Sequence, residues 1–333
     1  MDLTATDLTL RDLTDDDVPA WARLLADAEA VDDTGEHQDE TDLRRDLGLS
    51  SRQPGDYQGV WCDGTLVGTF WVLGREPADY LKIHCSGTTH PAHRGRGIGV
   101  VLRDAMLARA AAIHAERHPG GRAMVATTGI DGQADQRDLL TGAGFSVDRW
   151  SLAMLADLHG DPLTAPDLPA GLVLREFDEA LSPLMLAAHN EAFLDHPNWN
   201  PWSAAEWQEW VVEGRSFRPR LTVAAVDPAE PDRVVGYVQS AEFEAHQQVT
   251  GRREAYVGKV GVLRSHRGLG LATALLREVL VRAQAEGYDE AALDVDSANP
   301  TGALGVYERA GFAVRRRWAD YVLWREPVST PGR

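Results

Sequence analysis

One glycine-rich stretch, HRGRGIG at residues 93–99, recurs as HRGLGLA at residues 266–272. Each copy follows an apolar run typical of a strand and opens into a run whose apolar residues have helical spacing. A helix start leaves backbone N–H groups without intrahelical partners and carries the positive end of the helix dipole. Glycines let such a backbone approach a ligand closely and adopt positive φ angles. Each stretch therefore predicts an anion-binding loop, and a tight turn whose glycines serve geometry alone is the alternative.

The repeat extends over nearly the whole chain. Arg267 follows Arg94 by 173 residues, far more than the period of a solenoid repeat. A segment rich in proline and glycine separates the two copies, as expected of a linker. The sequence therefore predicts an N-terminal domain at 1–156, a linker at 157–170 and a C-terminal domain at 171–327.

Both halves show the same order of predicted elements: a strand, helices, three strands, the glycine loop, a helix, a strand, a short helix and a final strand. This mixture of strands and helices predicts a mixed α/β fold class for each domain. The helix after the loop is expected at 98–117 and at 270–286. The strands on either side of it are expected at 80–85 and 122–128 in the first half, and at 254–262 and 291–296 in the second.

Composition and charge narrow the class of protein. The chain has 333 residues and a net charge of −18, which disfavours binding to nucleic acid or to anionic membranes. The first residues, MDLTATDLTL, lack a signal-peptide pattern, and no apolar run is long enough to span a membrane. Only Cys62 and Cys85 are present, without histidine or cysteine at metal-ligand spacing. We therefore expect a cytoplasmic protein without a bound metal.

The loop does not match the two common nucleotide-binding patterns. A Walker loop ends in Gly-Lys-Ser/Thr, and the dinucleotide fingerprint follows the first strand of a βαβ unit. Here Arg-x-x-Gly-x-Gly/Ala follows a fourth strand. The stretches THPAHRGRGIGVVLRDAML and VGVLRSHRGLGLATALLREVL resemble the central strand, acyl-coenzyme A loop and helix of the GNAT superfamily of N-acetyltransferases. Arg264 departs from the pattern, because the family often has proline at that position.

The resemblance implies two tandem GNAT domains, each a mostly antiparallel mixed sheet with splayed central strands and flanking helices. It also implies acetyl-coenzyme A (acetyl-CoA) as co-substrate, with the loop amides on its pyrophosphate. The residues assigned to the cofactor in this way are Val260, Val262, Arg267, Gly268, Leu269, Gly270, Leu271, Ala272 and Asn299 in the second half, and Arg94, Gly95, Arg96, Gly97 and Gly99 in the first.

A second family signature is present in only one half. The second half has Asn299, then Tyr307 on a predicted helix that ends at a Gly-Phe pair. By resemblance, Asn299 contacts the pantetheine arm and Tyr307 donates a proton to the departing thiolate; a packing role for Tyr307 is the alternative. The first-half counterparts are Gly132 and Leu140, which have neither polar group. We therefore hypothesise that the first half is catalytically silent.

An amine acceptor is mostly protonated near pH 7, so a base must remove a proton before the amine attacks a thioester. Glu254, at the start of the fourth strand, is the candidate base, and an exposed strand-end glutamate is the alternative reading. Glu242 and Glu244 are weaker candidates for the same role. The residues expected to form the acceptor pocket are Asp195, His196, Trp199, Trp202, Asp294 and Asp296, with packing an equal alternative for the two tryptophans.

Three functions remain open at this level. The first is an acetyl-CoA-dependent N-acetyltransferase that modifies a primary amine of a small molecule. The two fused units, one of them degenerate, also resemble mycothiol synthase, a tandem member that acetylates a cysteinyl pseudo-disaccharide. The third is an acyl-CoA binding module without catalysis. Either a monomer, with its two domains packed as a pseudo-dimer, or a homodimer is compatible with these readings.

Overall fold

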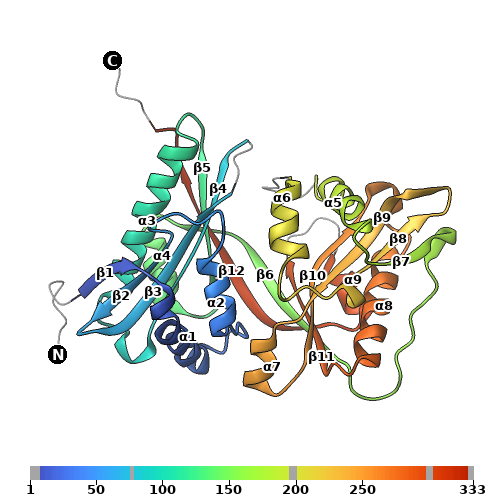
Figure 1. Cartoon of the computed structure of the whole chain (residues 1–333), viewed down its shortest axis with the longest axis horizontal. Coiled ribbons are helices and arrows are strands. Elements are labelled where there is room, and N and C mark those ends of the chain that lie inside the picture. The colour runs from blue at the N-terminus through green and yellow to red at the C-terminus, as the bar shows by residue number, and fades with distance from the viewer. Residues whose placement is uncertain (1–7, 76–78, 195–200, 298–302, 329–333) are drawn as a thin grey trace. The chain divides into compact units, whose positions relative to one another are not determined.

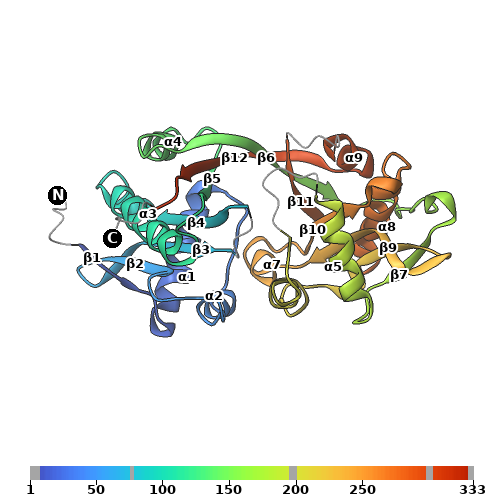
Figure 2. The same ribbon diagram turned by 90° about the horizontal axis from the view of Figure 1, so that it is seen from above.

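The computed structural model describes residues 8–75, 79–194, 201–297 and 303–328. The chain divides into two compact units. Unit 1 contains the residues up to Trp150 together with those from Trp318 onward, and unit 2 contains Ser151–Arg317. Each unit has one sheet with helices packed against it (Figures 1 and 2).

In unit 1 the strand order is β1-β2-β3-β4-β5-β12, and all neighbours are antiparallel except β4 and β5. The strands are β1 (Leu8–Asp12), β2 (Tyr57–Cys62), β3 (Thr65–Gly74), β4 (Leu81–Thr89), β5 (Ala123–Ile130) and β12 (Ala313–Arg325). The helices are α1 (Val18–Asp32), α2 (Glu40–Leu47), α3 (Ile98–Arg117) and α4 (Ala134–Thr141).

Unit 2 repeats this arrangement, with the order β6-β11-β10-β9-β8-β7 and one parallel pair, β10 with β11. The strands are β6 (Ser146–Asp157), β7 (Val173–Glu176), β8 (Val223–Asp227), β9 (Glu230–Ala241), β10 (Glu254–Val262) and β11 (Glu290–Asp296). The helices are α5 (Leu181–Ala192), α6 (Ala204–Trp207), α7 (Glu244–Thr250), α8 (Leu271–Ala285) and α9 (Ala303–Ala310).

The last strand of each half belongs to the sheet of the other unit. Residues 151–157 of β6 pair with β11, and residues 318–325 of β12 pair with β5. The units therefore differ from the sequential domains expected at 1–156 and 171–327. The physical reason is that β5 and β11 are repeats of each other and offer similar edges, so the sequence pattern does not distinguish the two possible partners of each final strand.

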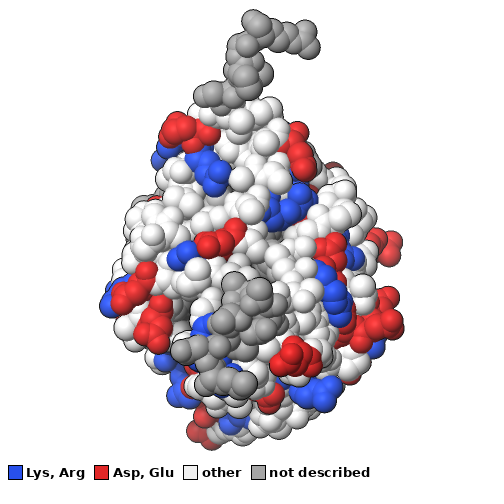
Figure 3. All heavy atoms as spheres, turned by 90° about the vertical axis from the view of Figure 1, so that its left-hand side faces the viewer, with Lys and Arg blue, Asp and Glu red and all other residues white. Residues whose placement is uncertain are grey.

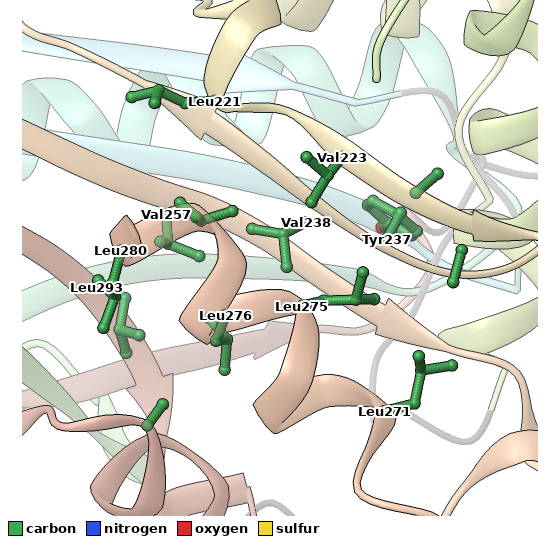
Figure 4. Close-up of a cluster of buried hydrophobic side chains, with 14 of the residues drawn as sticks. Leu221, Val223, Tyr237, Val238, Val257, Leu271, Leu275, Leu276, Leu280 and Leu293 are labelled. Atoms are coloured by element: carbon green, nitrogen blue, oxygen red, sulfur yellow. The ribbon is translucent and has the colours of Figure 1, made fainter. Parts of the chain in front are cut away.

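Two helices cover opposite faces of the unit 2 sheet. Val238 and Val257 lie in the core beside Leu276 of α8 (Figure 4). Tyr237, the neighbour of Val238 on β9, lies on the other face, where its hydroxyl is hydrogen-bonded to Nδ1 of His189 on α5. Because adjacent residues of β9 are buried on both sides, the sheet is the central layer of the unit.

Two local features shape unit 2. The connection between β9 and β10 contains α7. Helix α6 is followed by a single π-helical turn, Gln208–Val212. This wider turn changes the helical phase. Trp207 is buried, whereas Trp210 is 44% exposed.

The surface of unit 1 seen in Figure 3 carries acidic and basic side chains intermixed. The net charge of −18 is therefore not gathered into one acidic patch on this face. Among the described helices, none is long and apolar enough to cross a membrane.

Glu242, after the end of β9, has a structural role. Its carboxylate accepts hydrogen bonds from Nε of Arg218 at 2.7 Å, Nε of Arg253 at 2.8 Å and the hydroxyl of Tyr288 at 2.6 Å, and the residue is 5% exposed. Burial disfavours the carboxylate, but the donors outweigh it and lower the pKa of Glu242 to about 2. Glu242 is therefore not a general base, and Glu244 on α7 pairs with Arg215 at 2.6 Å.

The first prediction concerns the exchanged strand. A chain that ends at Arg317 lacks the part of β12 that pairs with β5, including the buried Tyr321. We expect amide hydrogen exchange to accelerate strongly in β4 and β5, because the unit 1 core loses one wall, while β10 and β11 stay protected. Loss of protection in β11 instead would show that β12 pairs within its own half.

The second prediction concerns the Glu242 network. Glu242→Gln is expected to lower the free energy of unfolding by about 3 kcal/mol at pH 7, because it removes the buried carboxylate that accepts from both Arg218 and Arg253. Since the folded pKa is about 2 and the ordinary value 4.5, the stabilisation is complete above pH 4.5 and is lost as the pH falls toward 2. Urea unfolding of both proteins from pH 3 to pH 7 checks this; a pH-independent difference would contradict it.

Candidate active site

The central strands of unit 2 diverge. Backbone pairing between β10 and β11 covers only Glu254↔Glu290 through Tyr256↔Ala292, although β10 continues to Val262 and β11 to Asp296. In unit 1, β4 and β5 likewise pair only as far as His84↔Ala126. Each unit therefore contains a fork between parallel strands, as the family resemblance implies. Beyond the fork, backbone groups of both strands are available to a ligand.

Strand β10 has an irregularity just past the start of the fork. Its register with β9 shifts between Val257 and Lys259, which makes Gly258 a β-bulge. A bulge leaves one residue out of the ladder and redirects the backbone. The register of β4 with β3 runs without a shift from Gly68↔Thr89 to Gly74↔Ile83. Sequence reasoning missed this feature, and the signal was a glycine inside a strand pattern.

The glycine loop ends β10 and begins α8. Gly268 and Gly270 have φ angles of 77° and 83°, and a Cβ built on either meets no atom within 4 Å. Gly95 and Gly97 repeat this conformation before α3, with φ angles of 73° and 81°. Both loops thus present an open backbone cradle at a helix start, which fits an anion.

The two loop arginines have partners within the protein. The guanidinium of Arg267 donates to the carbonyls of Val262 at 3.1 Å and Ala192 at 2.7 Å. Arg94 donates to the Asp32 carboxylate through two bonds of 2.8 and 2.6 Å. Each arginine therefore ties its loop to the end of the first helix of its half. Their assignment to the cofactor stays a prediction.

The side chains of the other loop residues differ in their exposure to solvent. The side chain of Leu271 is buried in the core, so only its backbone is available to a ligand. Leu269 is 49% exposed, and Arg96 is exposed. Val260 and Val262 lie on the part of β10 beyond the bulge, and Ala272 and Gly99 lie in the first turns of α8 and α3. Asn299 lies outside the described residues.

Tyr307 lies on α9, the short helix after β11. Its ring contacts Phe312 and packs against the unit 2 core, and burial raises the pKa of its phenol to about 12. The phenol therefore keeps its proton throughout the neutral range and has a hydrogen to donate to an acceptor. An ionised Tyr307 would oppose the ionisation of Tyr237. Tyr237 lies on β9, the strand that pairs with the bulged strand β10.

Unit 1 has the same helix ending without the phenol. The amide of Phe145 donates to the carbonyl of Leu140 at 3.1 Å, as that of Phe312 does to Tyr307 at 3.0 Å. Leu140 is 5% exposed, within the unit 1 core. The equivalence of Tyr307 and Leu140, expected from spacing alone, therefore holds in three dimensions.

Glu254 faces a group of charged side chains at the closed end of the fork. Its nearest partners are His246, with 3.9 Å between Nε2 and Glu254 Oε2, and its ladder neighbour Glu290. Burial raises the pKa of Glu254; His246 opposes this, while Glu290 and Asp294 add to it. A carboxyl group with a raised pKa is a stronger base than an exposed glutamate. The alternative of an exposed strand-end glutamate does not hold, because only 13% of the side chain is exposed.

The position of Glu254 holds a lysine in unit 1. Counting two residues back from the last paired residue of each fork gives Glu254 opposite Glu290 in unit 2 and Lys82 opposite Met124 in unit 1. Burial, with nearby arginines, lowers the pKa of Lys82 to about 8. Unit 1 thus has a cationic group where unit 2 has a carboxylate.

The donor atoms of His246, Glu254 and Glu290 lie within 4.8 Å of one another, a set of donor types that also occurs in cation sites. The cation that the described structure places against them is Arg252, whose Nε lies 2.5 Å from Glu290 Oε2. The Arg252 guanidinium therefore offsets part of the negative charge of this group.

Two of the residues expected in the acceptor pocket contact side chains of β10. The Asp294 carboxylate accepts a hydrogen bond of 2.8 Å from the Tyr256 hydroxyl, a contact that links β10 to β11 where their backbones separate. Trp202 is fixed by two reciprocal hydrogen bonds of 2.9 Å with the Asn190 side chain, and its ring lies 4.8 Å from Lys259 Nζ. Trp202 therefore lies beside the bulge.

The remaining pocket candidates are less well placed. Asp296, at the end of β11, is partly buried on the open part of the fork. Asp195, His196 and Trp199 lie outside the described residues.

Comparison with known proteins agrees with this geometry. Residues 179–312 match the Acetyltransferase (GNAT) family. A mycothiol acetyltransferase of Thermobispora bispora is 33% identical over 71% of this chain and 73% of its own length. A GCN5-related N-acetyltransferase from Sphaerobacter thermophilus superposes with a TM-score of 0.80 at 25% identity, over 98% of both chains. A tandem GNAT protein from the clavulanic acid biosynthesis pathway gives 0.68 at 20% identity, over 95% of this chain and 98% of its own.

These matches confirm the mixed α/β fold class and the family resemblance drawn from the glycine loops. The chain belongs to the GNAT family of acetyltransferases, in its tandem form, and is an acetyltransferase enzyme.

Proposed function

We propose that this enzyme transfers the acetyl group of acetyl-CoA to a primary amine of a small molecule, and that the chemistry takes place in unit 2. The observation that carries the proposal is the coincidence in one unit of the open glycine loop, the fork and the partly buried phenol of Tyr307. The family as a whole uses acetyl-CoA.

The residues present fit acetyl-CoA. A side chain at Gly268 or Gly270 would project into the open space above the loop, and a positive φ angle disfavours any residue but glycine there. The amides at the start of α8 would hold the pyrophosphate, with Asn299 assigned to the pantetheine arm by resemblance. When bound, acetyl-CoA supplies the thioester that the amine attacks.

The acidic and basic groups of unit 2 have complementary roles in this proposal. Glu254 removes a proton from the acceptor ammonium group, directly or through water, which frees the nitrogen lone pair. Tyr307 donates its proton to the sulfur as the carbon–sulfur bond breaks. A phenol with a pKa of about 12 stays protonated until this moment, and a base with a raised pKa takes up the amine proton more readily.

Unit 1 is proposed to be catalytically silent. It has Leu140 in place of the phenol and Lys82 in place of the carboxylate, so neither proton transfer has a group to perform it. The cation at Lys82 would also repel an ammonium acceptor. The unit 1 loop keeps the backbone conformation of a cradle, and Arg94, Gly95, Arg96, Gly97 and Gly99 are proposed to bind acetyl-CoA without turnover.

A cysteinyl pseudo-disaccharide, the acceptor of mycothiol synthase, is the specific second candidate. It is favoured by the relatives, which are mycothiol acetyltransferases at about 30% identity. Asp294, Asp296 and Trp202, with Asp195, His196 and Trp199, are proposed to bind the acceptor. A panel of small amines that includes this compound, assayed by thiol release, tests the proposal; release above the hydrolysis background with none of them would contradict it. A monomer or a homodimer is proposed for the assembly.

The third prediction tests the proton donor. Tyr307→Phe is expected to lower kcat about 100-fold or more while KM for acetyl-CoA changes little, because the ring stays and only the donor is lost. The control, Tyr321→Phe, removes the phenol of a buried tyrosine in unit 1 and is expected to keep full activity. Near-normal turnover of Tyr307→Phe would remove Tyr307 from the mechanism.

The fourth prediction tests which loop serves catalysis. Gly270→Ala and Gly97→Ala place a Cβ at N-cap glycines of nearly equal φ, so each is expected to cost about 1–2 kcal/mol of stability. Only Gly270→Ala is expected to raise KM for acetyl-CoA or abolish turnover. Equal losses of activity in the two variants would show that both loops contribute to the reaction.

A further inference from the structure

Helix α7 distinguishes the two units near the candidate base. Residues 242–253 connect β9 to β10 and carry this helix, whereas residues 75–80 connect β3 to β4, a segment shorter than α7 itself. The helix brings His246 to the closed end of the fork. The repeat thus differs between its two copies at the place where unit 2 has Glu254 and unit 1 has Lys82.

His246 lies between two carboxylates. Its Nε2 atom is 3.3 Å from Oε1 of Glu290 and 3.9 Å from Oε2 of Glu254. Only 12% of the His246 side chain is exposed, with 13% for Glu254 and 7% for Glu290. At this burial, charges interact much more strongly than on the surface. The ring therefore influences both carboxylates.

The charges around Glu254 come from three segments. Strand β11 contributes Glu290 and Asp294, which disfavour a second negative charge. The segment before β10 contributes Arg252, whose guanidinium pairs with Oε2 of Glu290. Helix α7 contributes His246, which opposes the carboxylates and favours ionised Glu254. Among the described residues of this group, His246 is the side chain whose ring nitrogen lies within ion-pair distance of Glu254 itself.

We propose that His246 is a positioning residue that holds Glu254 in the ionised form needed to deprotonate the acceptor. The proposal rests on the role of Glu254 in the proposed function. It assigns to α7 the task of keeping a buried base usable beside two other carboxylates. It also explains why the insertion is found in unit 2, whose fork carries the carboxylate, since Lys82 in unit 1 needs no such partner.

His246 and Glu290 shift the pKa of Glu254 in opposite directions, so their substitution is expected to have opposite effects. Without His246, the carboxylate loses a favourable charge, and a higher pH is needed to ionise it. Without the negative charge of Glu290, Glu254 loses an unfavourable neighbour, and it ionises at a lower pH. A buried charge at about 4 Å moves a pKa by about one unit or more.

The fifth prediction is the pH dependence of kcat/KM for the amine in the full-length enzyme. His246→Gln is expected to move the acidic limb to higher pH by about one unit, and Glu290→Gln to move it in the opposite direction. Gln248→Ala, on the exposed side of α7, is the matched control and should leave the limb unchanged. Thermal unfolding checks that each variant is folded.

The outcomes separate this proposal from the function on which it rests. If Glu254→Gln keeps near-normal activity at all pH values, Glu254 is not the base and the proposed mechanism fails. If Glu254→Gln is inactive but His246→Gln lowers kcat equally at every pH without moving the limb, His246 has a purely structural role and this inference is overturned. Should Glu290→Gln fail to fold, the His246→Gln profile alone decides.

Discussion

The fork between β10 and β11 is the constraint on which the rest of unit 2 depends. Parallel strands normally pair along their length, but here the ladder stops at Tyr256↔Ala292. The backbone groups beyond that point need other partners, because unpaired polar groups that are buried cost free energy. The Tyr256–Asp294 hydrogen bond, the bulge at Gly258, the glycine loop and Tyr307 all lie on elements that lead into or out of the fork. A ligand that inserts between the strands can supply the missing partners.

The duplicated units show how one fold can carry different chemistry. Both have the fork, two left-handed glycines in the loop and a final helix closed by a Gly-Phe pair. They differ in a few side chains at equivalent positions, with Lys82 and Leu140 in unit 1 and Glu254 and Tyr307 in unit 2. The proposed acid, the proposed base and helix α7 are all found in unit 2, so the proposed chemistry places no such demand on unit 1. Function therefore depends on the groups placed at the fork, and the fold alone does not decide it.

Local signals predicted much of the candidate site. The glycine spacing gave the loop conformation, since positive φ angles are intrinsic to glycine, and the Gly-Phe ending gave the equivalence of Tyr307 and Leu140. The partners of Arg94 and Arg267 could not be predicted in this way. Asp32 and the carbonyl of Ala192 lie far from them in sequence and approach only after the first helix packs on the sheet. The same holds for Glu242, where Arg218, Arg253 and Tyr288 come from three separate segments.

The sequence by itself determined the duplication, the mixed α/β class, the conformation of the glycine loops and the half that carries the phenol, because each depends on residue type and short-range spacing. Only the tertiary structure decided the strand exchange, since β5 and β11 offer similar edges to the final strands. It also decided the surroundings of Glu254. His246 and Glu290 lie close to this carboxylate in a buried setting, and this proximity arises only when α7, β10 and β11 pack together.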